Sequence, residues 1–108
     1  MDRVDNYRQI IREFLTSFAQ NNENDQLVFD DDHDRYLVIH NEWCNNRQMY
    51  GTSIHLDLID GQIWIQQNNT EIYIDRELIQ RGVNPKDLVL GLRAPAIRER
   101  IATALYST

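Results

Sequence analysis

His55 and Asp57 are the residues whose type and spacing most directly suggest chemistry. They are two positions apart in a run of alternating apolar and polar residues, so an extended strand would place both side chains on one face of a sheet. His40 lies in the preceding run, one strand away. An imidazole beside a carboxylate can transfer protons or hold a metal ion. These three residues define one hypothesis, a small metal-assisted hydrolase.

Other signatures of enzymes are missing from the sequence. It contains no His-Glu-x-x-His motif, no paired Cys-x-x-Cys, no glycine-rich phosphate loop and no nucleophile elbow. Cys44 has no neighbouring histidine to activate its thiol, which favours a small loop residue over a nucleophile. The alternative for His40, His55 and Asp57 is a polar sheet face that meets solvent or a partner. We expect this alternative, with no catalytic residue.

An acidic run provides the second cluster of chemically active side chains. Asp30, Asp31, Asp32 and Asp34, with His33 between them, could bind a divalent cation through hard oxygen ligands. The run lacks the regular spacing and the distal glutamate of an EF-hand loop. A solvated acidic turn is the alternative, and we expect neither a bound metal ion nor a cofactor.

Length and composition limit the classes of protein. The 108 residues fit one domain, residues 1–108, and 42% hydrophobic with 26% charged residues is typical of a soluble globular chain. No apolar run approaches the roughly 20 residues that span a bilayer, so no membrane contact is expected. Cys44 is the single cysteine and cannot form an internal disulfide, which favours the reducing cytoplasm.

Net charge argues against autonomous DNA binding. The 11 Lys and Arg residues oppose 17 Asp and Glu residues, a net charge of −6, whereas binding to nucleic acid depends largely on neutralising phosphates. The last segment is the basic exception, with Arg93, Arg98 and Arg100 against Glu99. An arginine-rich helix face there could contact DNA phosphates or an acidic partner, and an ordinary solvated helix is the alternative. A DNA-binding regulatory protein is therefore a second hypothesis.

Hydrophobic periodicity predicts the elements that position these residues. Val4, Tyr7, Ile11, Phe14 and Phe18 recur at steps of three and four, which predicts an amphipathic helix over about residues 3–20. The other expected elements are a strand at 27–29, a strand at 35–43, a second helix with Ile74 and Leu78 inward that ends at Gly82, a single turn at 85–87, an extended segment at 89–92, and a last helix that begins at Pro95.

Two turns predict the register of an antiparallel sheet. Asp60-Gly61 is typical of a two-residue type I′ hairpin, which pairs Leu58 with Ile63, Leu56 with Ile65, and His55 with Gln66. A four-residue turn at 44–47 would place Leu37 opposite Ile54, Ile39 opposite Thr52, and Asn41 opposite Tyr50. Both turns then predict the same core face, made by Leu37, Ile39, Ile54, Leu56, Leu58, Ile63 and Ile65.

The reverse face of this predicted sheet is a mixture of polar and aromatic residues. We expect it to carry the partner-binding site, with Tyr36, His40, His55, Asp57, Trp64 and Gln66 as candidate contacts. Trp64 is the most informative of these, because a large exposed aromatic is typical of the centre of an interface. The alternative is that one of the later helices covers it.

Short blocks spread over nearly the whole chain carry a further signal. They are Tyr7 to Ile11, Tyr50-Gly51, Ile54-His55, Asp57, Asp60 to Asn68, Thr70-Glu71, Glu77-Leu78, Gly82-Val83 and Val89-Leu90-Gly91. Together they resemble the XisI family, named as the fdxN element excision controlling factor and found mostly in cyanobacteria. One departure is that members usually follow the Leu-Gly of the last block with Phe and a double proline, whereas this chain has residues 92–95, LRAP.

The resemblance implies a small cytoplasmic protein that acts with a companion, XisH, to control a site-specific recombinase. That recombinase excises an inserted DNA element during heterocyst differentiation. The family is not known for an enzymatic activity, so the resemblance supplies no catalytic residues. It implies binding to a XisH-type protein, with a recombinase complex as a further partner and direct DNA contact not expected.

The expected fold is α+β: an N-terminal helix, an antiparallel sheet of about four strands with helices on its apolar face, and short C-terminal helices. A homodimer is also expected, because a free sheet edge or an aromatic reverse face favours self-association.

Overall fold

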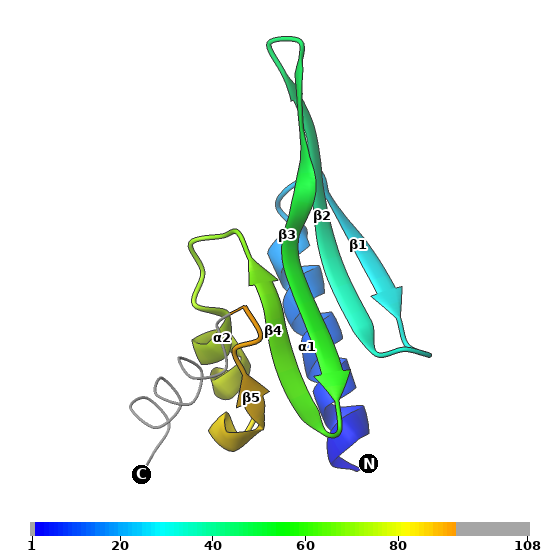
Figure 1. Cartoon of the computed structure of the whole chain (residues 1–108), viewed down its shortest axis with the longest axis vertical. Coiled ribbons are helices and arrows are strands. Elements are labelled where there is room, and N and C mark those ends of the chain that lie inside the picture. Colours follow the sequence, from blue (N-terminus) through cyan, green and yellow to red (C-terminus); the bar gives the residue numbers. More distant parts are fainter. Residues whose placement is uncertain (1, 93–108) are drawn as a thin grey trace.

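The computed structural model describes residues 2–92 and builds them around one five-stranded sheet (Figure 1). The sheet order is β1-β2-β3-β4-β5; all neighbours are antiparallel except β4 and β5, which are parallel. In chain order the elements are α1 (Arg3–Ala19), β1 (Asp25–Asp30), β2 (Arg35–Cys44), β3 (Arg47–Ile59), β4 (Gln62–Asn68), α2 (Ile74–Gln80), the 3-10 turn η1 (Pro85–Asp87) and β5 (Leu88–Val89). The α+β class is confirmed; the two-residue β5 adds a strand to the four expected.

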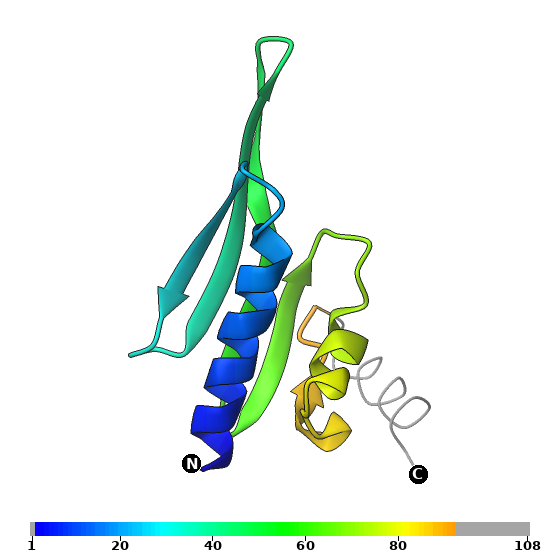
Figure 2. The same ribbon diagram turned by 180° about the vertical axis from the view of Figure 1, so that it is seen from behind.

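Helix α1 forms because its sequence supplies both a cap and a continuous apolar stripe. The Asp2 carboxylate accepts a hydrogen bond from the Asp5 amide, which satisfies a donor that the first turn leaves free. The stripe is buried on the sheet, as Figure 2 shows, with α1 lying across its face. The core comprises residues from every layer: Tyr7, Ile10, Ile11, Phe14, Leu15, Tyr36, Val38, Ile54, Leu56, Leu58, Ile63, Ile65, Ile74, Leu78, Val83 and Leu88.

The Asp60-Gly61 hairpin is confirmed. Both turn residues have positive φ angles, 51° and 76°, as a type I′ turn requires. Leu58 pairs with Ile63 and Leu56 with Ile65, as predicted. A bulge between His55 and Leu56 then shifts the ladder by one residue, so the predicted pairing of His55 with Gln66 is wrong and His55 pairs with Gln67.

The hairpin between β2 and β3 differs more from expectation. Its turn is Asn45-Asn46, two residues with φ of 52° and 64°, instead of four residues. Asn41 pairs with Tyr50 and Ile39 with Thr52, as predicted, but the register shifts between Val38 and Ile39 because β3 carries the extra residue Ser53. Leu37 is therefore opposite His55, not Ile54.

This bulge exchanges the two faces of β2 relative to the prediction. A period of two means that one extra residue moves every following side chain to the other side of the sheet. Tyr36 and Val38 are fully buried under α1, whereas Leu37 and Ile39, expected in the core, lie on the opposite face and are half-buried.

The segment after β4 follows the prediction closely. Helix α2 buries Ile74 and Leu78 and is followed by Gly82 at a φ of +112°, where a side chain would be strained. Asn84 caps η1 by accepting a hydrogen bond from the Lys86 amide. The extended segment expected at 89–92 is reduced to Leu88–Val89, and the helix expected from Pro95 lies outside the described residues.

The helices of residues 2–92 all lie on one side of the sheet or beside it (Figures 1 and 2). None of these helices is long and apolar enough to cross a membrane. Beyond the end of α1, the β2–β3 hairpin continues as a two-stranded ribbon that projects from the rest of the chain, at the top of Figure 1.

Candidate interaction surface

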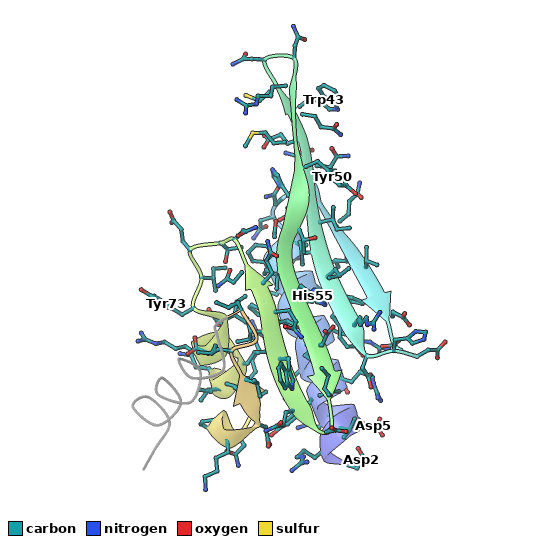
Figure 3. The ribbon with its side chains drawn as sticks, viewed as in Figure 1. Asp2, Asp5, Trp43, Tyr50, His55 and Tyr73 are labelled. Atoms are coloured by element: carbon teal, nitrogen blue, oxygen red, sulfur yellow. The ribbon has the colours of Figure 1, made fainter. Side chains whose placement is uncertain are left out.

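The face of the sheet opposite α1 is the surface where most of the candidate contacts lie. We call it the outer face and define it by Val28, Leu37, Ile39, His55, Asp57, Trp64 and Gln66, each of which alternates with a neighbour directed to α1. Figure 3 shows His55 on this uncovered side. Val28 is 41% exposed, and Leu37 and Ile39 are half-buried. Apolar and polar side chains therefore mix here, as at protein interfaces.

A hydrogen-bonded group occupies the centre of the outer face. His55 Nε2 lies 2.8 Å from Asp57 Oδ1, and Gln66 Nε2 donates to Asp57 Oδ2 at 3.2 Å. Both carboxylate oxygens of Asp57 are thus engaged, and the side chain is 14% exposed. This arrangement orients His55 on the face and connects β3 to β4. Three of the candidate contacts, His55, Asp57 and Gln66, are brought together as predicted.

Trp64 lies opposite Asp57 in the β3–β4 ladder and is half-buried. The main chain at Gly91 packs closely on it: a Cβ atom there would lie 3.2 Å from the Trp64 ring and 2.3 Å from Gln66 Oε1. Neither alternative from the sequence describes Trp64 fully, because the segment after β5 covers part of the indole and leaves part exposed. The glycine itself was the available signal, since a close main-chain approach is a common reason for one.

Tyr36 does not belong to the outer face, and its prediction as a partner contact is wrong. The Ser53 bulge turns it to the core, where it is fully buried and packs edge-to-face on Phe29 at 5.7 Å between ring centroids. Its hydroxyl donates to Asp31 Oδ1 at 3.0 Å, with Asp34 Oδ1 at 3.2 Å. Burial, and then these carboxylates, raise the pKa of Tyr36.

The acidic turn between β1 and β2 is attached to α1 by ion pairs. Arg8 Nε lies 2.8 Å from Asp34 Oδ1, and Arg12 pairs with Asp31. Asp30 pairs with His33 inside the turn, and this hydrogen bond lowers the pKa of Asp30. Residues 2–92 hold no group of three side chains placed to bind a metal ion. The carboxylates of Asp31 and Asp34 are matched by arginines of the neighbouring helix.

His40 lies on the opposite side of the sheet from His55 and Asp57, so the fold does not bring the three residues of the hydrolase hypothesis together. On β2 it follows Val38 on the α1 side, just beyond the helix. Its Nδ1 lies 2.9 Å from Asp25 Oδ1 and its Nε2 lies 3.0 Å from Glu42 Oε2. Hydrogen bonds to Asp25, then to Glu42, raise the His40 pKa. His40 thus joins β1 to β2 and is not an outer-face contact.

The projecting ribbon is a surface that the sequence analysis did not single out. We call residues 41–50 the arm. Trp43 is 68% exposed, Tyr50 67% and Met49 51%. Figure 3 shows Trp43 and Tyr50 on the projecting ribbon. Cys44 is exposed close to the tip. The spacing of Trp43 and Tyr50 around Asn45-Asn46 was an available signal, because an Asn-Asn pair favours the positive φ angles of a tight hairpin.

The basic residues Arg93, Arg98 and Arg100 lie outside the described residues. Their contact with DNA phosphates or an acidic partner stays a prediction.

Comparisons with known proteins agree on one family. A family model described as XisI protein matches residues 1–105. A solved XisI-like protein from Anabaena variabilis ATCC 29413 is similar with a TM-score of 0.85 and 32% identity, over 90% of this chain and 94% of that one. The fdxN element excision controlling factor XisI from the same organism has a TM-score of 0.80 and 24% identity, over 94% and 96%, and shares the fold. No curated protein matches.

Proposed function

The chain belongs to the XisI family, and from this premise we propose that it is a non-catalytic accessory factor that controls excision of a DNA element of the fdxN type. It acts by binding a XisH-type companion protein in the cytoplasm, and through it a site-specific recombinase complex. The cellular setting is heterocyst differentiation in cyanobacteria. Homodimers are part of the same proposal.

The outer face supports a binding role more than a catalytic one. One broad side of the sheet is left uncovered by the helices of residues 2–92 and presents Val28, Leu37, Ile39 and part of Trp64 around a small polar centre. Exposed apolar area of this kind, with polar groups that already have partners, favours contact with another protein. The imidazole of His55 has one carboxylate beside it and no second titratable partner among the described contacts.

We propose the outer face as the companion site, centred between Leu37 and Trp64. The test is co-purification of tagged protein with the companion at physiological salt, comparing wild type with Trp64→Ala and Leu37→Lys. Loss of a large buried apolar contact at an interface centre weakens binding by about 2 kcal/mol or more, roughly a thirty-fold change in Kd. Tyr73→Ala is the control, because it also removes an aromatic side chain from the surface, 67% exposed, but at the N-cap of α2 and away from the outer face.

Circular dichroism of each variant must show a folded protein. A complex retained by Trp64→Ala and Leu37→Lys would overturn the outer face as the site, and no complex with wild type would overturn companion binding itself.

A further inference from the structure

The arm has two open edges. The β1 ladder ends at the pair Asp25–His40, beyond which the Asn41 amide donates to the Asn24 carbonyl, and the β4 ladder ends at Ile54–Asn68. Neither β1 nor β4 pairs with residues 42–50. At the base of the β3 edge, the side chains of Gln67 and Asn69 donate to the main-chain carbonyl of Thr52. The main-chain amide of Asn69 donates to the main-chain carbonyl of Ser53. Beyond this point no described residue pairs with the β3 edge. The edge from Gln48 to Gly51 is therefore open to a further strand.

Open edges are normally protected, and this one is not. Natural sheets protect an edge with lysine, proline, a bulge or an inward-pointing charge. Gln48, Met49, Tyr50 and Gly51 provide none of these, and a two-stranded ribbon on its own is only marginally stable in water. An additional strand would satisfy main-chain groups of β3 and stabilise the ribbon.

The arm also carries its own apolar surface. Asn41 pairs with Tyr50 and Trp43 with Gln48, so alternation places Trp43 and Tyr50 on the same face of the ribbon. Both side chains are two-thirds exposed. Tyrosine and tryptophan are enriched in interfaces because they bury a large area while losing little conformational freedom.

Charge indicates which partner the arm fits. A two-fold contact brings the same surface of two copies together, so a chain with a net charge of −6 meets least repulsion from a second copy where its surface is neutral. In residues 41–50 the acid Glu42 is balanced by Arg47, and the arm is neutral. The neutral arm is therefore a surface on which a second copy of this chain can pack without charge repulsion.

We propose that the arm pairs with the arm of a second copy along the β3 edge, antiparallel, to form a four-stranded ribbon around a two-fold axis. An antiparallel pairing of identical strands is self-complementary, because each copy offers the same donors and acceptors in reverse order. Tyr50 of each copy then lies near the axis and Trp43 extends the apolar face on either side. The inference gives an interface to the homodimer of the proposed function and rests on that part of it; it is independent of companion binding.

The test uses purified full chain without any companion. Sedimentation velocity over a wide concentration range should show twice the 12.9 kDa chain mass at high concentration and the single chain on dilution. Tyr50→Lys should raise the dimer dissociation constant at least ten-fold, because each two-fold contact then brings two like charges together. Tyr73→Lys is the matched control, since Tyr73 has the same 67% exposure outside the arm, and should leave the constant unchanged.

A cross-link fixes the geometry. In a Cys44→Ser background, Tyr50→Cys or Met49→Cys should form an intermolecular disulfide on mild oxidation, because directly opposed residues of antiparallel strands have Cβ atoms close to bridging distance. Tyr73→Cys in the same background should not. A wild type that stays monomeric at every concentration, a dimer indifferent to Tyr50→Lys, or a dimer that neither arm cysteine cross-links would each overturn the proposal. Since the companion is absent, none of these results bears on companion binding.

Discussion

His40 lies between two carboxylates, Asp25 of β1 and Glu42 of β2. The Asp25 side chain is almost fully buried. A protonated imidazole donates from both nitrogens and so satisfies both carboxylates, whereas the neutral ring has a single N–H and must leave one contact without its donor. This difference is the physical reason that the pKa of His40 is raised in the folded protein.

The raised His40 pKa makes folding stability depend on pH. A group that binds its proton more tightly when folded stabilises the protein fully below its unfolded pKa, about 6.5, and loses that contribution as pH rises through the higher folded value. We therefore expect wild type to exceed His40→Gln in free energy of unfolding by a larger margin at about pH 6 than at about pH 9.

Urea denaturation at both pH values measures this margin. His33→Gln is the control, because His33 also pairs with an aspartate but is 68% exposed, and an exposed pair contributes little. If His40→Gln lowered the free energy of unfolding equally at the two pH values, the hydrogen bonds of protonated His40 to Asp25 and Glu42 would not contribute to stability.

At the scale of the elements, an ion pair between Arg8 and Asp34 connects α1 to the turn between β1 and β2. The Arg8 Nε and Nη2 lie 2.8 and 3.3 Å from the two oxygens of Asp34, and the pKa of Arg8 is raised by that carboxylate. Arg8→Ala should lower the free energy of unfolding by about 1–3 kcal/mol, because a partly buried aspartate loses its partner. Arg12→Ala is the control, since its pair with Asp31 is more exposed and should cost less than about 1 kcal/mol. Equal effects in thermal or urea unfolding would contradict this ranking.

The helices and hairpins were predicted more accurately from the sequence than the side of β2 that faces α1. Helix α1, the Asp60-Gly61 hairpin and the α2–Gly82 end have strong local signals, an apolar stripe or a residue that favours positive φ. The faces of β2 had no such signal. Residues 36–39, YLVI, are all apolar, so alternation could not decide which pair points to α1.

The decision depends on two features outside β2. Ser53 adds one residue to β3, and the buried Tyr36 directs its hydroxyl to acceptors in Asp31 and Asp34. Long-range pairings of this kind leave no periodic trace in the chain. The Asp60-Gly61 turn fixed the faces of β3 and β4, so the outer-face position was predicted correctly for His55, Asp57, Trp64 and Gln66. Tyr36 and His40 lie on β2, whose faces the Ser53 bulge exchanges, so their positions were predicted wrongly.

At the scale of the whole molecule, the two proposed surfaces lie at different places. The outer face is centred on β2–β4 opposite α1, whereas the arm extends beyond the end of the helix (Figure 3). The two surfaces adjoin on β2, where Ile39 and Asn41 share one face, but Trp64 lies opposite Asp57, seven residues along β3 from Tyr50. Changes at two positions this far apart, with no shared contact, are nearly additive, so we expect each to affect only its own proposed partner.

This separation predicts a crossed pattern in two variants. Tyr50→Lys should abolish dimers in sedimentation yet still co-purify the companion, whereas Trp64→Ala should lose the companion and keep the wild-type dimer dissociation constant. The double variant should show both losses with no additional effect, because the two changes touch separate contacts. If Tyr50→Lys also releases the companion, then the companion binds the arm directly or binds only the dimer. In either case the outer face is not the whole of its binding site.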